Sequence, residues 1–252
     1  MAGAKARIDS LLVERGLVQS RERARALILA GRVLVNEQKI DKPGAAVAAD
    51  AALRLLGDDL PYVSRGGLKL AAALDTWKIE VPGRVCLDVG ASTGGFTDCL
   101  LQHGASHVTA IDTGFGQIAM KLRNDPRVSL MERTNARLLE AGSLTAEPEP
   151  TLLVMDVSFI SVTLVLPAVL AAAPAIREAV ILVKPQFEAG REHVGKGGIV
   201  RDPAAHRLAI DRVAQCVRGE GGEAAAVIDS PITGAEGNVE FLLHARFNRN
   251  LY

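Results

Sequence analysis

Cysteine is scarce in this sequence of 252 residues, which contains three in all. Cys86, Cys99 and Cys216 lie far apart, and this spacing fits neither a disulfide framework nor a zinc site. Isolated cysteines of this kind are typical of reduced, buried positions in a cytoplasmic protein. Aromatic residues are also rare, at 4%, which argues against an RNA-binding sheet that stacks bases on aromatic side chains.

The chain has no net charge, because 29 Lys and Arg balance 29 Asp and Glu. A nucleic-acid partner must therefore be bound by a local patch and not by the field of the whole protein. Residues 5–32 contain seven basic and three acidic side chains. Within this stretch Arg21 and Arg25 lie one helical turn apart, so both can face one line of phosphates. An ordinary solvated helix face explains the same charges equally well.

Long apolar runs are absent except for one. Val157 to Ile176 spans 20 residues without a formal charge, which is long enough to cross a bilayer. However, Pro167 and Pro174 interrupt it, and it continues the apolar run that contains Asp156. A strand end, a loop and a short helix explain the segment better. The N-terminus has no apolar run of signal-peptide length, and we expect a protein of the cytoplasm without membrane segments.

The first part of the chain, residues 5–56, predicts two short helices followed by short strands. Ser20 is placed to cap the second helix, and Gly31 to end it. The segment 32–40 alternates apolar and polar residues as a half-buried strand does, and the segment 51–56 is another expected short strand.

Farther along, apolar strands alternate with helices, which is typical of a mostly parallel sheet with helices on both faces. Asp202 and Pro203 are placed to start a helix that runs to about Gly219. The last strand, NVEFLLHARF, is expected to pair antiparallel at the edge of the sheet. We therefore predict a small α+β domain over residues 1–60 and an α/β domain over residues 61–252.

The segment LDVGASTGGFTDCLL joins a buried strand to a helix through small residues. Its glycine pattern differs from the dinucleotide motif G-x-G-x-x-G, and it lacks the Lys-Ser/Thr of a P-loop. Asp88 at the strand end suits a cationic ligand, although it can instead cap the helix. Asp112 ends the next strand, where an acid can bind both ribose hydroxyls. This favours S-adenosylmethionine over a nicotinamide cofactor, with candidate contacts at Asp88, Gly90, Ser92, Gly94, Phe96, Asp112 and Asn135.

The chain resembles the TlyA family of rRNA 2′-O-ribose methyltransferases in seven segments that occur in the same order: SRGGLKL, LDVGASTGGFTDCLL, ERTNAR, MDVSFIS, LVKPQFE, VGKGGIVRDP and GNVEFL. The segment that begins RIDSLLVERG is similar to the S4 RNA-binding domain of that family. The resemblance covers nearly the whole chain. It implies an S4-like domain followed by an FtsJ-like, Rossmann-like class I methyltransferase domain with a seven-stranded sheet.

The resemblance also implies a Lys-Asp-Lys-Glu catalytic tetrad, which falls on Lys69, Asp156, Lys184 and Glu240. The residue pattern independently supports Asp156 and Lys184 as members of this site. An unpaired charge at the end of a buried strand is costly, and ligands bind at this edge of open α/β sheets. Lys69 alone is indistinguishable from a surface lysine. The implied reaction transfers a methyl group from S-adenosylmethionine to a ribose 2′-hydroxyl of 23S or 16S rRNA, with cytidine as the target. No metal is implied.

A methyl transfer to a 2′-hydroxyl needs a group that removes its proton. Lysine is ordinarily protonated at neutral pH and is then no base. Burial and a neighbouring ammonium group favour the neutral amine, whereas nearby carboxylates favour the charged form. Our hypothesis is that Lys184 is the base, with its neutral form favoured by burial and by Lys69. Asp156 and Glu240 would orient the ammonium groups and the hydroxyl.

Ribosomal RNA is the expected partner, bound through phosphate contacts that position it without reading its sequence. The candidate side chains are Arg7, Arg21, Arg23, Arg25, Arg32 and Arg65. Two other classes of protein stay open: a non-catalytic RNA-binding or ribosome assembly factor, which the intact tetrad disfavours, and a membrane-lytic protein, as the haemolysin names within the family suggest. The sequence leaves the oligomeric state open.

Overall fold

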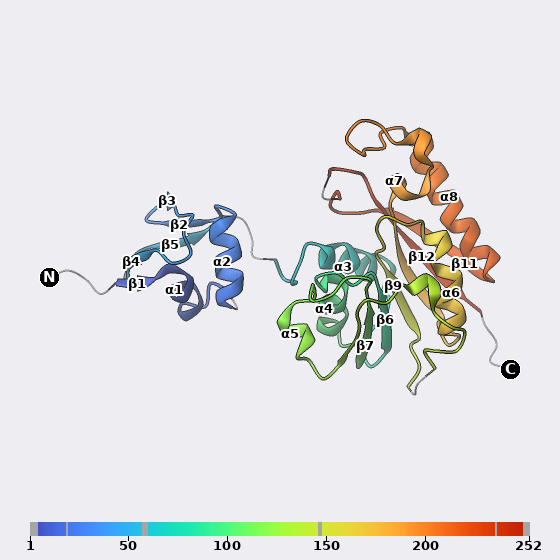
Figure 1. Cartoon of the computed structure of the whole chain (residues 1–252), viewed down its shortest axis with the longest axis horizontal. Helices are drawn as coiled ribbons and strands as arrows, with labels where there is room; N and C mark the ends of the chain where they lie inside the picture. Colours follow the sequence, from blue (N-terminus) through green and yellow to red (C-terminus); the bar gives the residue numbers. More distant parts are fainter. Residues whose placement is uncertain (1–4, 19, 57–59, 146–147, 235, 249–252) are drawn as a thin grey trace. The chain divides into compact units, whose positions relative to one another are not determined.

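The computed structural model describes residues 5–18, 20–56, 60–145, 148–234 and 236–248 (Figure 1). Contacts divide the chain into two compact units, Met1–Pro61 and Tyr62–Tyr252. Each unit has its own hydrophobic core, and each is described separately below.

The first unit is a small α+β fold. Its elements in chain order are β1 (Lys5–Arg7), α1 (Ile8–Glu14), α2 (Arg21–Leu29), β2 (Val33–Val35), β3 (Gln38–Lys39), β4 (Ala46–Ala48) and β5 (Leu53–Leu55). The two helices bury Ile8, Leu12 and Ile28 against one another. Ser20 caps α2 as predicted, because its Oγ atom accepts a hydrogen bond from the Arg23 backbone amide at 3.1 Å.

Two features of this unit differ from the prediction. The segment 32–40 is a hairpin and not one strand, because Asn36 and Glu37 both adopt positive φ angles, 48° and 64°, the geometry of a tight type I′ turn. The pairing of β1 with β4 was not predicted. Each of these strands is three residues long, too short to show an alternating pattern.

The second unit is an α/β fold of one seven-stranded sheet. Its strands are β6 (Val85–Val89), β7 (His107–Ile111), β8 (Val128–Met131), β9 (Leu152–Met155), β10 (Glu178–Val183), β11 (Gly222–Asp229) and β12 (Phe241–Phe247). They lie in the order β11-β12-β10-β9-β6-β7-β8. The five neighbouring strands β10, β9, β6, β7 and β8 are parallel, and β12 is antiparallel to both of its neighbours.

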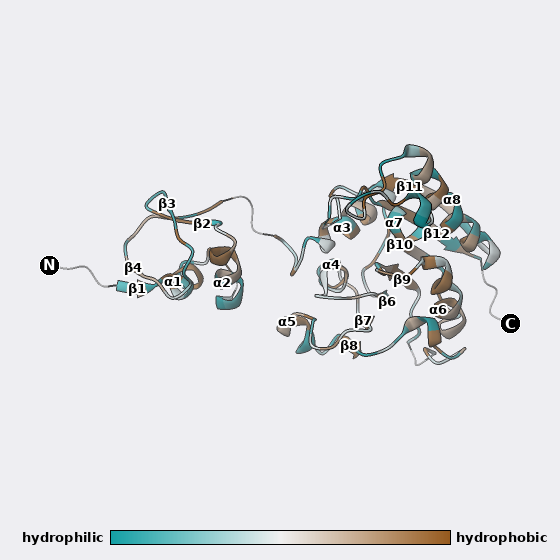
Figure 2. Ribbon diagram, turned by 45° about the horizontal axis from the view of Figure 1, so that its top comes forward, coloured by the Kyte–Doolittle hydropathy of each residue, from teal (hydrophilic) through white to brown (hydrophobic). Residues whose placement is uncertain are grey.

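Helices cover both faces of the sheet, as predicted (Figure 1). One face packs against α3 (Gly66–Trp77), α4 (Gly95–Gln102) and α5 (Met120–Arg123). The other packs against α6 (Leu166–Ala172) and α8 (Pro203–Gly219). Helix α7 (Pro185–Glu188) follows β10 and contacts α8. Successive residues of β9 and β10 alternate between the two cores. Apart from Glu178, the residues of both strands are therefore apolar, and the strands appear brown in Figure 2. The remaining elements are the 3-10 turns η1 (Ala136–Leu138), η2 (Val162–Leu164) and η3 (Arg191–His193).

NVEFLLHARF pairs antiparallel with β10, the last of the parallel strands, as predicted, but it is not the outermost strand of the sheet. Strand β12 lies between β10 and β11, and β11 is the edge strand. The reason is visible in their burial: nearly every residue of β12 is buried, whereas β11 alternates between half-buried and exposed residues. A strand with one solvated side suits an edge.

The segment Val157 to Ile176 is no membrane span. It folds into a loop, η2 and α6, with Pro167 in the first turn of α6. Among the described residues, no helix has the length and apolar character to cross a bilayer. The helix predicted to start at Asp202 is α8, whose Ala204 amide donates to Asp202 Oδ1 at 2.9 Å.

The connections place a crevice at one point of the sheet. From β6 the chain moves to β7 and β8, then crosses back to continue with β9 and β10 on the other side of β6. In open α/β sheets, ligands bind beyond the carboxyl ends of the strands at such a reversal. Here those ends are the residues that follow Val89 and Met155.

Candidate active site

The turn after β6 brings the chain into close contact with the end of β9. Gly90 has a φ of 88°, and a Cβ atom added to it would lie 2.4 Å from the Asp156 carbonyl oxygen. Only glycine fits both the conformation and the space. Two residues later, the Ser92 amide donates to Asp112 Oδ2 at 2.8 Å, and the Gly114 amide donates to Oδ1 at 2.7 Å. The carboxylate at the end of β7 therefore holds both loops at this edge.

Two adjoining cavities open at the carboxyl ends of the strands. We call the first, of about 370 Å³, the lysine cavity, because Lys69 and Lys184 line it. The second, of about 510 Å³, is the Asp112 cavity. The residues that line both are Gly90, Ser92, Asp156, Ser158 and Phe159. A ligand in one cavity therefore lies beside a ligand in the other.

The four residues of the expected tetrad line the lysine cavity. They form two ion pairs: Lys69 Nζ lies 2.5 Å from Glu240 Oε2, and Lys184 Nζ lies 2.6 Å from Asp156 Oδ1. Lys69 comes from α3, and the others directly follow β9 and β10 or precede β12. Both lysines are buried, and a buried ammonium is stable only with such a partner.

The cofactor candidates divide between the two cavities. Phe96 lines the lysine cavity, Asp112 and Asn135 line the other, and Gly90 and Ser92 line both. Asn135 also caps η1, because its Oδ1 atom accepts from the Arg137 amide at 3.1 Å. Asp88 and Gly94 are not among the lining residues of these cavities.

Asp88 is fully buried. Its Oδ2 atom accepts from Thr97 Oγ1 at 2.6 Å, which ties β6 to the first turns of α4. Its Oδ1 atom has no hydrogen-bond partner among the described residues. Burial raises the pKa of Asp88 to about 7, against the hydrogen bond from Thr97. The side chain thus holds α4 in place, and its position does not support direct contact with a ligand.

Two residues of this site were not predicted. Lys184 Nζ donates to Ser158 Oγ at 2.6 Å, so the lysine is held by a hydroxyl as well as by a carboxylate. Phe159 is 92% exposed and has a φ of 64°. It lies at the mouth shared by both cavities. Ser158 and Phe159 lie two and three residues after Asp156 in the motif MDVSFIS, and this position was the available signal.

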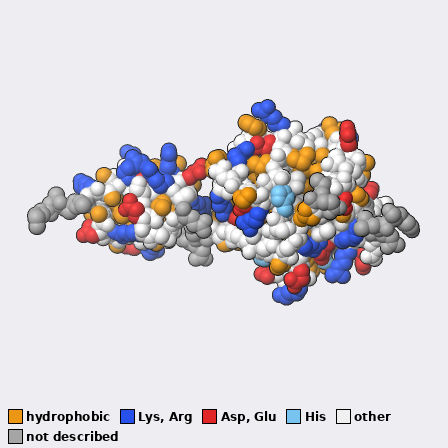
Figure 3. All heavy atoms as spheres, turned by 90° about the horizontal axis from the view of Figure 1, so that it is seen from below, with side chains coloured by type: hydrophobic (Ala, Val, Ile, Leu, Met, Phe, Trp, Pro, Cys, Tyr) orange, Lys and Arg blue, Asp and Glu red, His pale blue; other side chains and the backbone are white. Residues whose placement is uncertain are grey.

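The expected RNA contacts of the first unit include an ordered pair of arginines. Asp9 is fully buried and accepts from Arg7 (2.9 and 3.1 Å) and from Arg21 (3.2 Å). Hydrogen bonds from Arg7, supported by those from Arg21, hold the pKa of Asp9 well below its ordinary range. Both arginine side chains remain more than half exposed, at 55% and 58%. Basic side chains gather on one side of this unit in Figure 3.

The other basic candidates differ in their surroundings. Arg25 is exposed on α2, and Arg23 is half-buried. Arg32 Nε donates to the Leu56 carbonyl at 2.8 Å. Arg65 is exposed and lines the lysine cavity in the second unit.

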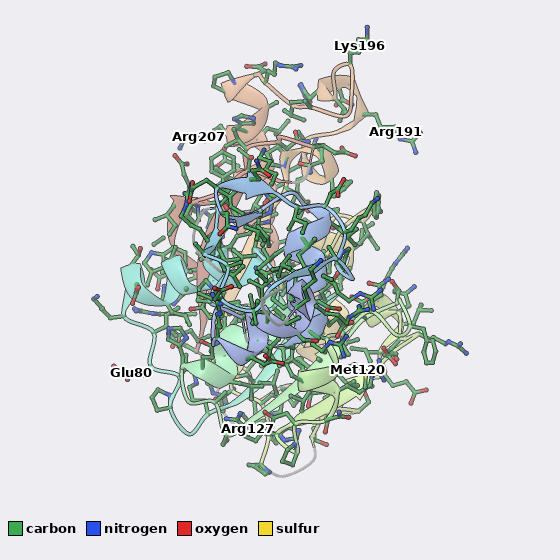
Figure 4. The ribbon with its side chains drawn as sticks, turned by 90° about the vertical axis from the view of Figure 1, so that its left-hand side faces the viewer. Glu80, Met120, Arg127, Arg191, Lys196 and Arg207 are labelled. Carbon is green, nitrogen blue, oxygen red and sulfur yellow. The ribbon has the colours of Figure 1, made fainter. Side chains whose placement is uncertain are left out.

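Further basic side chains of the second unit lie on the segment after α7. Arg191 and Lys196 are exposed and project outward there (Figure 4). Over the described part of the chain, no cluster of three or more His, Cys, Asp or Glu side chains is arranged to hold a metal ion.

The chain is similar to known proteins along its length. The S4 domain family matches residues 6–52, and the FtsJ-like methyltransferase family matches residues 62–247. The 16S/23S rRNA (cytidine-2′-O)-methyltransferase TlyA of Mycobacterium tuberculosis is 46% identical, over 96% of this chain and 90% of that protein. Hemolysin A of Brachyspira hyodysenteriae is 40% identical, over 94% of this chain and 98% of its own length.

A solved structure shares the architecture of both units. It is that of a Streptococcus thermophilus protein named as a candidate hemolysin, which is 42% identical to this chain with a TM-score of 0.74. The match covers 97% of this chain and 89% of the other.

Proposed function

The chain belongs to the TlyA family, which joins an S4 domain to an FtsJ-like methyltransferase domain, and on this premise we propose that it methylates the ribose 2′-hydroxyl of a cytidine in ribosomal RNA. The observation that carries the proposal is the lysine cavity itself. Two buried lysines, each paired with a carboxylate at 2.5 or 2.6 Å, face one space at the strand ends. A protein that only binds RNA has no need for buried lysines.

The Asp112 cavity suits S-adenosylmethionine. Gly90 leaves room for a ligand to approach the backbone closely, since no side chain covers the turn there. Asp112 stands where an acid binds ribose hydroxyls in folds of this kind, and Asn135 is placed for the adenine. When bound, S-adenosylmethionine supplies a methyl group on a positively charged sulfur. Asp156 lines both cavities and would place negative charge near that sulfur.

Lys184 is the proposed base of the reaction. Its Nζ atom must first lose a proton to solvent. It then accepts the proton of the 2′-hydroxyl while the ribose oxygen bonds to the methyl carbon, the bond from that carbon to sulfur breaks, and neutral S-adenosylhomocysteine leaves. Asp156 and Ser158 fix the position of Nζ. The sequence hypothesis gave Lys69 the task of favouring neutral Lys184. Because Lys69 has its own carboxylate partner in Glu240, we assign this second pair to orienting the ribose hydroxyl instead.

The first unit is proposed to hold the RNA. Its arginines offer phosphate contacts, and Arg7 and Arg21 are held side by side through Asp9. Two arginines fixed on a buried acid lose little side-chain freedom when they bind a phosphate. Ribosomal RNA as the substrate comes from the name of the Mycobacterium tuberculosis relative. It agrees with the cytoplasmic location expected from the sequence.

The test is transfer of a labelled methyl group from S-adenosylmethionine to isolated small and large ribosomal subunits, followed by nuclease digestion and nucleoside analysis. The proposal predicts label in 2′-O-methylcytidine. If no nucleoside is labelled while the protein still binds S-adenosylmethionine, the assembly-factor alternative takes its place. Leakage of liposomes caused by the protein without RNA would support the membrane-lytic alternative.

A further inference from the structure

Helix α7 presents three side chains to one segment of the chain. Lys184 immediately precedes the helix. Phe187 and Glu188 lie within it, three and four residues after Lys184, and at this spacing the three side chains share a face. All three contact residues 156–162, which we call the β9 loop. Lys184 binds Asp156 and Ser158, and the ring centroids of Phe187 and Phe159 lie 5.5 Å apart.

The third contact is the strongest anchor. Glu188 is 4% exposed, and both its carboxylate oxygens bind the far end of the β9 loop. Oε1 accepts from the Val162 amide at 2.8 Å, and Oε2 accepts from Ser161 Oγ at 2.5 Å. Burial raises the pKa of Glu188, against these two hydrogen bonds. A buried carboxylate costs free energy that an apolar residue would avoid, so its presence here indicates a need for exact placement of the loop.

The β9 loop needs such anchors. Its residue Phe159 has a positive φ of 64° and is almost fully exposed, and a non-glycine residue keeps such a conformation only when its surroundings impose it. The Asp156 amide fixes the start of the loop by donating to the Val89 carbonyl at 2.9 Å. Glu188 fixes the end. Arg212 on α8 in turn donates to the Glu188 carbonyl at 2.7 Å, so α7 is itself anchored to the core.

We propose that Glu188 is a positioning residue for methyl transfer, which holds the β9 loop so that Asp156 and Ser158 meet Lys184. This inference rests on the proposed function, because it concerns the geometry of the same base. Glu188 is absent from both cavities. It acts on the reaction through the loop, without contact to either substrate.

The first test compares three variants by their kinetics with S-adenosylmethionine and ribosomal subunits. Glu188→Ala is expected to lower kcat at least tenfold and to raise the KM for S-adenosylmethionine by a smaller factor, because the β9 loop also lines the Asp112 cavity. Glu188→Gln is expected to keep most of the activity, since the amide carbonyl can accept from Val162 and the amide nitrogen can donate to Ser161. Glu192→Ala is the matched control, because Glu192 is an exposed glutamate of the neighbouring turn η3 and should behave as wild type.

A second test does not depend on the reaction. Hydrogen–deuterium exchange of the peptide that covers residues 156–164 should be at least tenfold faster in Glu188→Ala and unchanged in Glu188→Gln, with β9 and β10 protected in both. If Glu188→Ala fails to fold, Ser161→Ala removes one of the two hydrogen bonds and should lower kcat severalfold.

The outcomes separate this inference from the proposed function. If the wild type is active, the proposed methyl transfer stands. Normal kcat in Glu188→Ala, or faster exchange throughout the second unit of this variant, then contradicts the positioning role alone. An inactive wild type contradicts the proposed function, and in that case unchanged exchange of residues 156–164 in Glu188→Ala also contradicts the anchor.

Discussion

The Oγ atom of Ser158 accepts a hydrogen bond from Lys184 Nζ at 2.6 Å. The contact joins two residues that follow neighbouring parallel strands, β9 and β10. A lysine side chain has four rotatable bonds, and its ordering in one position costs conformational entropy. Ser158, together with Asp156, therefore fixes the position of this nitrogen in the lysine cavity, where we propose that the ribose hydroxyl binds.

Replacement of this hydroxyl tests its role in holding the lysine. We expect Ser158→Ala to lower the kcat for rRNA methylation about fivefold, which corresponds to the loss of one ordinary hydrogen bond of about 1 kcal/mol. The affinity for S-adenosylmethionine, followed by calorimetry, should change less than kcat, although Ser158 also lines the Asp112 cavity. Ser143→Ala, at an exposed turn position, is the control. An unchanged kcat in Ser158→Ala would show that Asp156 alone orients the lysine.

The buried Asp88 makes stability depend on pH. Its pKa is raised from 3.8 to about 7 in the folded protein, so the folded state binds the proton more tightly than the unfolded state. Asp88 therefore contributes stability that is fully present below pH 4 and is lost as the pH rises through about 7. The total change is on the order of 4 kcal/mol at most.

Asp88→Asn resembles the protonated form and should remove this dependence. The free energy of unfolding of the variant minus that of wild type is expected to be larger at pH 8 than at pH 5, as measured by urea unfolding at both pH values. The comparison within each pH cancels the contributions of other titrating groups. An equal difference between variant and wild type at the two pH values would mean that Asp88 is ionised throughout.

The shared acid of the first unit predicts an effect on RNA binding. In Asp9→Asn the charge that holds Arg7 and Arg21 together is lost, and we expect the affinity for rRNA to fall about tenfold, or about 1.4 kcal/mol. Filter binding at several salt concentrations measures this, and circular dichroism checks that the unit folds. S-adenosylmethionine affinity should be unaffected. Asp41→Asn changes an exposed acid of the same unit and should bind RNA normally; equal behaviour of both variants would contradict the role of the arginine pair.

Much of the larger unit could be predicted from its sequence, because strands that are buried on both faces of a sheet have continuous apolar sequences. The cap at Asp202 likewise located α8. The order of the last two strands could not be predicted, because a strand's own residues report how buried it is and not which strand lies beside it. The same limit hid the pairing of β1 with β4, whose residues lie about 40 positions apart in the sequence.

Side-chain direction set a similar limit at the site. The sequence placed Asp88 at a strand end beside the glycine turn, but only the fold shows that the carboxylate points to Thr97 and away from the cavities. The grouping of Lys69 with Glu240, which are 171 positions apart, came from the family resemblance and not from any local pattern. Glu188 was hidden for the same reason, since its partners Ser161 and Val162 belong to a distant segment.

We propose that Lys184 accepts the proton of the ribose hydroxyl, and the sharpest test of this role is single-turnover methylation of ribosomal subunits by Lys184→Arg. Arginine keeps the positive charge and the hydrogen-bond donors but stays protonated in proteins. We expect a loss of at least a thousandfold in rate, as in Lys184→Ala, with S-adenosylmethionine affinity within a few-fold of wild type. A Lys184→Arg protein that methylates within tenfold of the wild-type rate would contradict the claim, because a fixed positive charge would then be sufficient.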